Sequence, residues 1–210
     1  MPVTLITGTS RGIGKHLAER QLMFGDQVIG CSRGESTIDH PSYKHFSADF
    51  LYDEFVGDMP RIDNLINCAG MASMNLAMLT PIEKVRDIFA TNVLATYQMS
   101  TEAMRKGCKR IINFSTVAVP LNLAGESAYA ASKAAVESLT RTMAKEFAPF
   151  GCTVNAVGPT PIPTDLIKGI DQGKLDKLFE QQAIKRMGSM QDVANVVDFF
   201  LNPRSDFITG

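Results

Sequence analysis

The sequence predicts an α/β fold in which helices cover both faces of a parallel β-sheet. Short apolar runs rich in valine and isoleucine alternate along the chain with longer segments of helical periodicity. A glycine-rich segment joins the first apolar run to the first helical one. The 45% hydrophobic and 20% charged content is typical of a globular protein, and 210 residues can bury a substantial core. We therefore expect residues 1–210 to form a single domain.

Five apolar runs predict strands that are buried on both faces, because they are continuous rather than alternating. They are Val3–Ile6, Val28–Cys31, Leu65–Asn67, Arg110–Phe114 and Thr153–Val157. His45–Ser47 is a weaker strand candidate between the second and third of these. The final residues, Ile208–Gly210, resemble the start of a further strand, so we expect the C-terminal strand to be truncated.

Helical segments lie between and after these strands. Behind the glycine-rich segment, Ile13, Leu17 and Phe24 share one face at helical spacing. Two later helices are predicted over Ala128–Phe147 and Met190–Leu201. Alternation of strands and helices favours a parallel sheet whose strands are joined by crossover helices.

The stretch Pro81–Arg105 predicts one long helix. Thr80 is expected to be its N-cap, Pro81 its first residue and Glu83 the acid of a capping box.

Charge and cysteine usage exclude several classes of function. The formal net charge is −1 with acids and bases mixed, which predicts neither a nucleic-acid nor a membrane partner. The four cysteines occur singly, so we expect neither a disulfide framework nor a bound metal. With no signal peptide and no long apolar run, we expect a cytoplasmic protein. The histidines, His16, His40 and His45, share no spacing and are expected to be structural or solvated.

The segment Thr7–Gly14, with the pattern Gly-x-x-x-Gly-x-Gly, follows a predicted strand and opens a helix. Glycines allow a backbone to approach a pyrophosphate closely, and the free N–H groups of a helix N-terminus attract it. The context predicts a dinucleotide-binding loop in a Rossmann-like, doubly wound sheet. The alternative is an ordinary strand–helix turn that happens to contain three glycines.

The end of the second strand indicates which cofactor is preferred. An acid at this point favours NAD, whereas a basic residue accommodates the 2′-phosphate of NADP. The strand runs into Ser32 and Arg33 with no acid before Glu35. Arg33, together with Arg11, predicts a preference for NADP(H), with NAD(H) as the alternative. Both arginines could instead be ordinary solvated residues.

Tyr129 and Lys133 are four residues apart in a predicted helix, so their side chains share one face. A free phenol has a pKa near 10, and a nearby cation would lower the pKa toward a range useful for proton transfer. The pair follows a buried strand that ends in two hydroxyl residues, Ser115 and Thr116. This pattern predicts reduction of a carbonyl, with Tyr129 supplying the proton; the alternative is a tyrosine–lysine stack on a helix surface.

With these motifs in place, the whole chain resembles the short-chain dehydrogenase/reductase family, most of all its 3-oxoacyl-(acyl carrier protein) reductase-like members. The glycine loop matches the family's cofactor loop, and Asn67–Gly70 its turn after the fourth strand. Tyr129 and Lys133 match the active-site pair, and Asn92 matches the catalytic asparagine.

The resemblance implies a role for each matched residue. Tyr129 would be the proton donor, Lys133 would lower the pKa of Tyr129 and bind the nicotinamide ribose, and Asn92 would hold a water linked to Lys133. Asp49 resembles the acid that contacts adenine, while Pro159, Ile162 and Thr164 resemble the segment beside the nicotinamide. The implied catalytic set is Asn92, Thr116, Tyr129 and Lys133. The implied cofactor-binding set is Gly8, Ser10, Arg11, Gly12, Ile13, Gly14, Arg33, Asp49, Asn67, Ala69, Gly70, Tyr129, Lys133, Pro159, Ile162 and Thr164.

The chain departs from the family pattern at two site positions, and a lid is also expected. The catalytic serine position is Thr116, preceded by Ser115, which leaves open which hydroxyl serves. The Pro-Gly after the sixth strand is Pro159-Thr160, which stiffens the loop together with two further prolines. Residues Pro163–Lys185 resemble the family's substrate lid.

The sequence therefore predicts an NADPH-dependent oxidoreductase that reduces a ketone or a 3-oxoacyl thioester to the secondary alcohol. One alternative is an NAD-dependent secondary-alcohol dehydrogenase. Another is a non-catalytic nucleotide-binding sensor or scaffold of the same fold. The resemblance also implies a homodimer or homotetramer.

Overall fold

The computed structural model describes residues 1–49, 59, 61–165 and 172–210. Its centre is a six-stranded, wholly parallel sheet in the order β3-β2-β1-β4-β5-β6. The strands are β1 (Val3–Thr7), β2 (Gln27–Ser32), β3 (Tyr43–Ser47), β4 (Asn64–Asn67), β5 (Arg110–Phe114) and β6 (Thr153–Val157). All six predicted strands are confirmed, with two of them identical in their bounds. The predicted α/β fold is thus the observed one.

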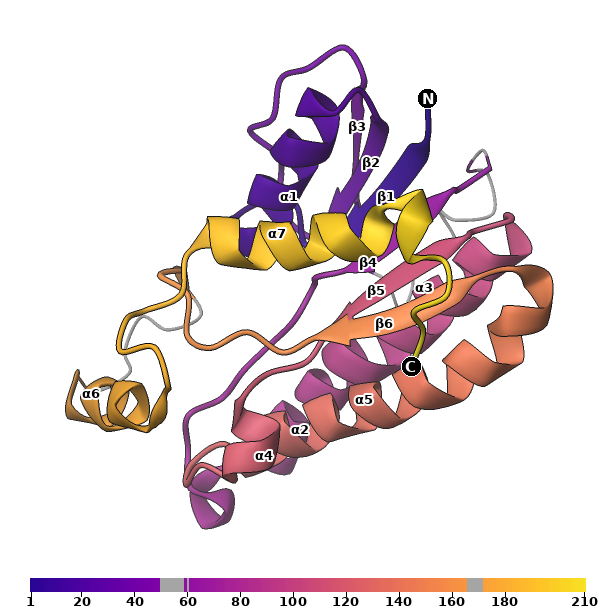
Figure 1. The fold of residues 1–210 in the computed structure, drawn as a ribbon. Helices are drawn as coiled ribbons and strands as arrows, with labels where there is room; N and C mark the ends of the chain where they lie inside the picture. Colours follow the sequence, from indigo (N-terminus) through magenta and orange to yellow (C-terminus); the bar gives the residue numbers. More distant parts are fainter. Residues whose placement is uncertain (50–58, 60, 166–171) are drawn as a thin grey trace.

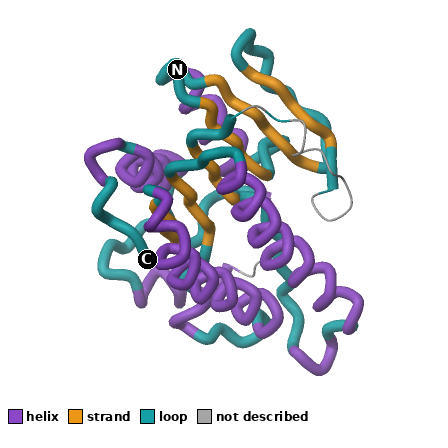
Figure 2. The backbone as a smooth tube through the Cα atoms, turned by 90° about the vertical axis from the view of Figure 1, so that its right-hand side faces the viewer, coloured by secondary structure: helices purple, strands orange, loops and turns teal. Residues whose placement is uncertain are grey.

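Helices cover both faces of the sheet (Figures 1 and 2). One face carries α1 (Gly12–Met23) and α7 (Met190–Leu201); the other carries α3 (Ala95–Arg105) and α5 (Ser127–Phe147). The shorter elements are η1 (Ala77–Leu79), α2 (Ile82–Phe89), η2 (Ala90–Leu94), α4 (Ala118–Leu121), η3 (Ala148–Phe150), α6 (Gln172–Gln181) and η5 (Pro203–Ser205).

The core has two layers because successive strand residues point to opposite faces. Leu5 and Ile111 pack toward α3 and α5, whereas their neighbours Ile6 and Ile112 pack toward α1 and α7. All four side chains are at most 1% exposed. Burial on both faces explains why these strands read as continuous apolar runs.

The long predicted helix Pro81–Arg105 is interrupted. Residues Ala90–Leu94 form a single π-helical turn, which divides the segment into α2 and α3. The prediction that Thr80 is the N-cap is wrong: the cap position is Pro81, without a side-chain hydrogen bond. Thr80 Oγ1 instead donates back to the Leu76 carbonyl, 3.0 Å away, and so belongs to the preceding turn.

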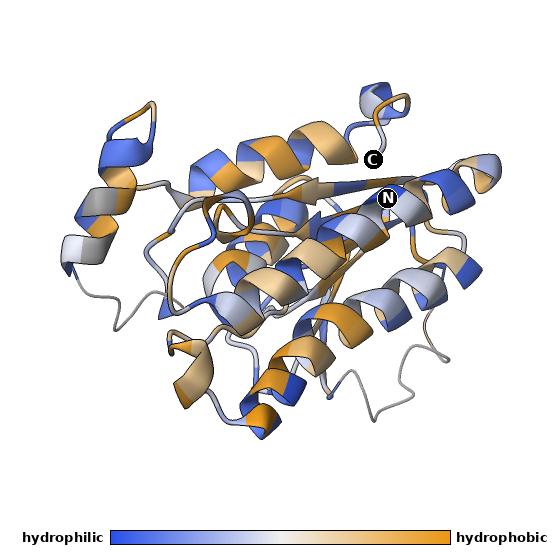
Figure 3. Cartoon of the chain, turned by 90° about the horizontal axis from the view of Figure 1, so that it is seen from below, coloured by the Kyte–Doolittle hydropathy of each residue, from blue (hydrophilic) through white to orange (hydrophobic). Residues whose placement is uncertain are grey.

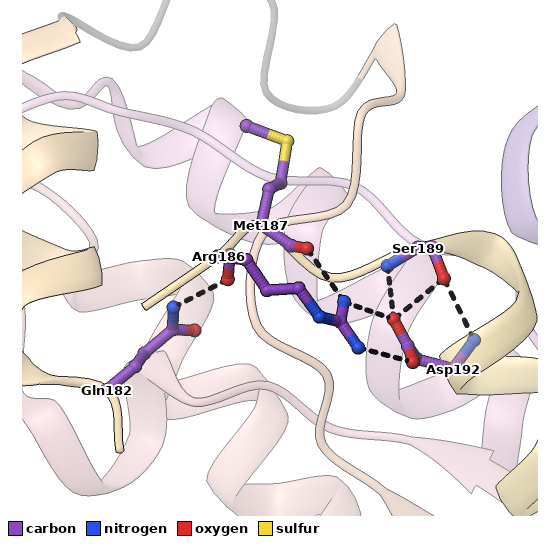
Figure 4. Close-up of polar contacts among 5 residues, drawn as sticks. All are labelled: Gln182, Arg186, Met187, Ser189 and Asp192. Atoms are coloured by element: carbon purple, nitrogen blue, oxygen red, sulfur yellow. Dashed lines mark hydrogen bonds and ion pairs between the residues drawn. The ribbon is translucent and has the colours of Figure 1, made fainter. Parts of the chain in front are cut away.

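A capping box fixes the start of α7 (Figure 4). Ser189 Oγ accepts a hydrogen bond from the Asp192 N–H, and the Asp192 carboxylate accepts one from the Ser189 N–H. Arg186 forms two hydrogen bonds with the same carboxylate, at 2.7 and 2.8 Å. The hydrogen bonds from Arg186 and Ser189 hold the pKa of Asp192 well below its usual range.

The final residues lie along the outer edge of β6. The Gly210 N–H donates to the Val154 carbonyl at 2.9 Å, and Thr209 Oγ1 accepts from the Val154 N–H at 2.9 Å. Among the described residues, no helix is both long and apolar enough to span a bilayer. Figure 3 shows hydrophobic and hydrophilic residues alternating along the helices.

Truncating a side chain in the middle of the sheet is expected to destabilise the fold. Ile66 is fully buried in β4, so Ile66→Ala should lower the free energy of unfolding by about 2–5 kcal/mol through lost burial and a residual cavity. The matched control is Ile82→Ala, because Ile82 in α2 is 57% exposed and should change stability by less than about 0.5 kcal/mol. Denaturant unfolding of the three proteins measures both values, and equal losses would contradict the assignment of Ile66 to the core.

Candidate active site

A cavity of about 680 Å³ opens at the carboxyl edge of the sheet, where β1 and β4 lie side by side. In a doubly wound sheet the connections after two such strands diverge to opposite faces, which leaves a crevice between them. All the predicted cofactor-binding residues line this cavity except Asn67 and Ile162. The sheet topology therefore gathers residues from position 8 to position 164 around one space.

The glycine loop closes one side of the cavity with exposed backbone. Gly8 has a φ of 79°, a conformation that favours glycine, and its N–H bonds the Cys31 carbonyl at 2.7 Å. A Cβ at Gly14 would lie 2.4 Å from the Gly8 carbonyl oxygen, so only glycine allows the helix to start this close to the loop. The N-terminus of α1 thus faces the cavity with free N–H groups, an arrangement that fits a dinucleotide pyrophosphate.

Two arginines border the same cavity, and the structure distinguishes them. Arg11 Nη1 lies 3.5 Å from the Asp165 carboxylate, so this guanidinium already has an anionic partner. Arg33 is exposed at the end of β2, in the turn that follows Ser32. Arg33 is therefore the better placed of the two to receive an additional anion.

Asn67 and Ile162 lie elsewhere, although both were predicted to contact the cofactor. Asn67 is 3% exposed, and its Nδ2 donates to Asn113 Oδ1 at 2.9 Å and to Ser100 Oγ at 3.0 Å. It therefore joins β4 to β5 and α3 instead of lining the cavity. Ile162 lines a second cavity next to the first.

Tyr129 stands on the wall that the two cavities share. Thr116 hydrogen-bonds its phenol. Ser115 Oγ instead donates to Glu137 Oε1, 2.6 Å away on α5. Of the two hydroxyls that the sequence left open, Thr116 is the one that contacts Tyr129.

Lys133 is buried beside Tyr129, and burial moves the pKa values of the two groups in opposite directions. Its Nζ donates to the Phe114 carbonyl at 2.7 Å, and burial lowers the pKa of Lys133 to about 8. Burial raises the pKa of Tyr129 to about 12, although the Thr116 hydrogen bond opposes the shift. The expectation that Lys133 depresses the pKa of Tyr129 is not met in this structure, since desolvation dominates both groups.

Asn92 is completely buried in the π-helical turn and holds the backbone next to Lys133. Its Oδ1 accepts from the Met71 N–H at 2.8 Å, and its Nδ2 donates to the Met71 carbonyl and to Ser132 Oγ, both at 2.9 Å. A Cβ at Gly70 would lie 3.5 Å from both Asn92 Oδ1 and Lys133 Nζ. Asn92 is therefore part of the same cluster as Lys133, while its expected role in holding a water stays a prediction.

The second cavity, about 340 Å³, is largely apolar. Its wall includes Met74 and, from α6, Leu175 and Leu178. Among its described lining residues, the only carboxylate is Glu126 and there is no lysine or arginine. The predicted lid, Pro163–Lys185, contributes Thr164, Leu175, Leu178 and Gln181 to this wall, whereas its residues 166–171 lie outside the described part of the chain.

Sequence reasoning missed several residues of this region. Ser132 links Asn92 to the backbone of α5, because its Oγ also donates to the Tyr129 carbonyl at 2.7 Å. Glu137 accepts the hydrogen bond of the Ser115 hydroxyl, and Asp165 forms an ion pair with Arg11. Glu137 could have been found from its helical spacing, four residues after Lys133, whereas no local signal marks Ser132 or Asp165.

Comparison with known proteins places this geometry among oxidoreductases. The family model described as enoyl-(acyl carrier protein) reductase matches residues 44–210. The 3-oxoacyl-(acyl-carrier-protein) reductase FabG of Vibrio cholerae is 34% identical over 230 residues, which cover 99% of this chain and 93% of that protein. A solved 4-hydroxyisoleucine dehydrogenase complexed with NADH superposes with a TM-score of 0.90 at 23% identity, covering 100% of this chain and 94% of the other. A solved short chain dehydrogenase/reductase family protein gives a TM-score of 0.89 at 29% identity, covering 99% and 92%.

The pKa of Lys133 predicts how stability depends on pH. The pKa of Lys133 is about 8 in the folded state, whereas the ordinary pKa of lysine is 10.5. Between these two pH values the unfolded chain binds more protons than the folded one, so stability rises with pH through that window. The free energy of unfolding of the wild type relative to Lys133→Met should therefore increase from pH 7.5 to pH 9.5. Denaturant titrations of both proteins at several pH values test this, and a difference that stays constant or falls would contradict it.

Proposed function

The chain belongs to the short-chain dehydrogenase/reductase family, and we propose that it reduces a ketone or a 3-oxoacyl thioester to the secondary alcohol with NADPH. It is an oxidoreductase that acts on CH–OH groups, as its relatives are. The observation that carries the finer proposal is the position of Tyr129 on the wall between the two cavities. A carbonyl held there would face a dinucleotide on one side and an apolar pocket on the other.

The residues of the chain would manage the proton and the substrate oxygen. With its pKa raised by burial, Tyr129 is protonated at neutral pH and can donate that proton to the oxygen as it becomes an alkoxide. The Thr116 hydroxyl, which bonds the phenol, is placed to hold the same oxygen. Lys133 and Asn92 would fix the base of the site through Phe114 and Met71. When bound, the nicotinamide supplies the hydride to the carbonyl carbon.

The glycine loop and the N-terminus of α1 would hold the pyrophosphate. Asp49 would face the adenine, and Pro159 and Thr164 the nicotinamide end, with Lys133 near its ribose. Arg33 supports the choice of NADPH, because its guanidinium borders the cavity at the end of β2, where a 2′-phosphate would need a cation. NADH, which the solved 4-hydroxyisoleucine dehydrogenase carries, remains the alternative cofactor.

The second cavity supports an uncharged, apolar substrate. Its lining of methyl and methylene groups suits an acyl or alkyl chain, and none of its described side chains could neutralise a substrate carboxylate. The name of the Vibrio cholerae relative agrees with an acyl thioester. The intact set of Asn92, Tyr129 and Lys133 speaks against a purely non-catalytic scaffold.

We also propose that the protein forms a homodimer or homotetramer. Apolar side chains on α7 and the tail, Phe199, Phe207 and Ile208, are 51%, 97% and 43% exposed next to the edge strand β6. Exposed apolar groups gathered in this way mark surfaces where proteins associate.

Replacing the phenol tests the assigned proton donor. Tyr129→Phe removes only the hydroxyl, so NADPH-dependent reduction of 3-oxoacyl thioesters and ketones should fall at least about 100-fold while NADPH still binds. Tyr97→Phe is the matched control, because Tyr97 on α3 is 53% exposed and its loss should leave turnover unchanged. Steady-state rates across a substrate panel provide the measurement. Undiminished turnover in Tyr129→Phe would remove Tyr129 from the mechanism, and no turnover by the wild type on any substrate would overturn the reductase proposal.

Replacing Arg33 tests the assigned cofactor. Arg33→Ala should weaken NADPH binding about 10- to 100-fold, because a charge-assisted bond to the 2′-phosphate is lost, and should change NADH binding less than about threefold. Arg204→Ala, which replaces an exposed residue of η5, controls for the general loss of positive charge. Calorimetric titration with both dinucleotides gives the constants; equal losses for the two would show that Arg33 does not read the phosphate.

A further inference from the structure

The edge strand β3 carries a group of side-chain hydrogen bonds that the proposed chemistry does not use. Tyr43 Oη lies 3.0 Å from Thr9 Oγ1 and 2.9 Å from His45 Nδ1. On its other side, His45 Nε2 lies 2.9 Å from the Gly34 carbonyl oxygen. A continuous polar path therefore runs from the glycine loop, through the edge strand, to the turn after β2.

The partner on each ring nitrogen fixes the roles within this path. A backbone carbonyl can only accept, so His45 Nε2 must carry the proton that bonds Gly34. His45 Nδ1 is then free to accept from the Tyr43–Thr9 hydroxyl pair. The imidazole is thus anchored at both ends, in one orientation.

The backbone of β2 is adapted to this contact. A Cβ at Gly30 would lie 2.1 Å from Tyr43 Oη and 2.5 Å from Thr9 Oγ1. Glycine at this position is what allows the phenol to cross β2 and reach the fully buried Thr9. The contact is therefore built into the sheet and is not an accident of an exposed surface.

The path ends on the turn that carries Arg33. Ser32 Oγ donates to the same Gly34 carbonyl at 2.8 Å, and Ser47 Oγ donates to the Arg33 carbonyl at 3.2 Å. A Cβ at Gly34 would lie 3.8 Å from the Ser10 side chain, so the turn also rests against the glycine loop. Both peptide carbonyls of the Arg33–Gly34 turn are thus tied to side chains from β2 and β3.

We infer that His45 is a positioning residue for the 2′-phosphate of NADPH, acting through the Arg33–Gly34 turn. This inference rests on the proposed use of NADPH. A guanidinium on a turn that is already ordered loses less conformational freedom when it binds an anion, so affinity for the phosphate depends on the ties that order the turn. NADH has no group at this point, so its affinity should depend little on the same ties.

Two variants of His45 separate positioning from general stability. His45→Phe keeps a flat ring but removes both nitrogens, whereas His45→Gln keeps an amide N–H that can reach the Gly34 carbonyl. The probes are adenosine 2′,5′-bisphosphate and AMP, which differ only in the 2′-phosphate, together with NADPH and NADH. Binding is measured calorimetrically on the full chain, with thermal unfolding recorded for each variant.

In His45→Phe, the affinity for adenosine 2′,5′-bisphosphate and for NADPH should fall about tenfold, the size of one lost hydrogen bond to a turn. AMP and NADH should change less than twofold, and His45→Gln should recover most of the loss. If His45→Phe does not fold, Tyr43→Phe provides the test, because it removes only the hydroxyl next to His45 Nδ1. It should likewise lower the affinity for the bisphosphate relative to AMP, and for NADPH relative to NADH.

Equally weakened binding of all four ligands would overturn the inference, because His45 would then only support the fold. Unchanged binding of all four ligands would overturn it as well. These results are separable from failure of the cofactor assignment. A wild type that binds AMP as tightly as the bisphosphate overturns the use of NADPH, and this inference with it. A wild type that prefers the bisphosphate, and loses the preference in Arg33→Ala but not in His45→Phe, overturns the role of His45 alone.

Discussion

The reversal of strand order between β1 and β4 is the constraint on which the rest of this structure depends. All six strands are parallel, so their carboxyl ends lie at one edge, and the connections that leave β1 and β4 turn to opposite faces. The crevice between these connections is the larger cavity. Residues as distant in the chain as Gly8 and Thr164 meet there because each follows a strand, or the helix after one, at the same edge.

Burial sets the electrostatics of the catalytic end. Tyr129 and Lys133 both lie where a charge is costly, and each pKa moves toward the neutral form. The hydrogen bond from Lys133 to the Phe114 carbonyl and the grip of Asn92 on Met71 hold this cluster in place without a direct ion pair. The π-helical turn follows from the same requirement, because it carries the fully buried Asn92 toward the backbone after β4. The phenol of Tyr129 therefore keeps its proton at neutral pH.

The opposite end of the cavity is built from polar side chains on an edge strand. Because β3 is covered less completely than the central strands, it can carry Tyr43, His45 and Ser47 where an interior strand would carry apolar groups. These side chains tie the glycine loop and the Arg33–Gly34 turn to the sheet. The two ends therefore share a scaffold but differ in their surroundings: the side chains around Lys133 are buried, whereas those around Arg33 are hydrogen-bonded and partly exposed.

The sequence by itself determined the strands, the order of elements, the glycine loop and the spacing of Tyr129 and Lys133. These features are local: an apolar run, a turn that needs glycine or a helical repeat is visible within a few residues. Contacts between distant residues decided the rest. Four features involve partners that only packing brings together. They are the π-helical turn, the contact of Tyr129 with Thr116 and not Ser115, the position of Asn67 away from the cavity wall, and the hydrogen bonds of His45. The pKa values follow the same division, because they depend on how deeply the folded sheet and helices bury each group, and no local pattern records that depth.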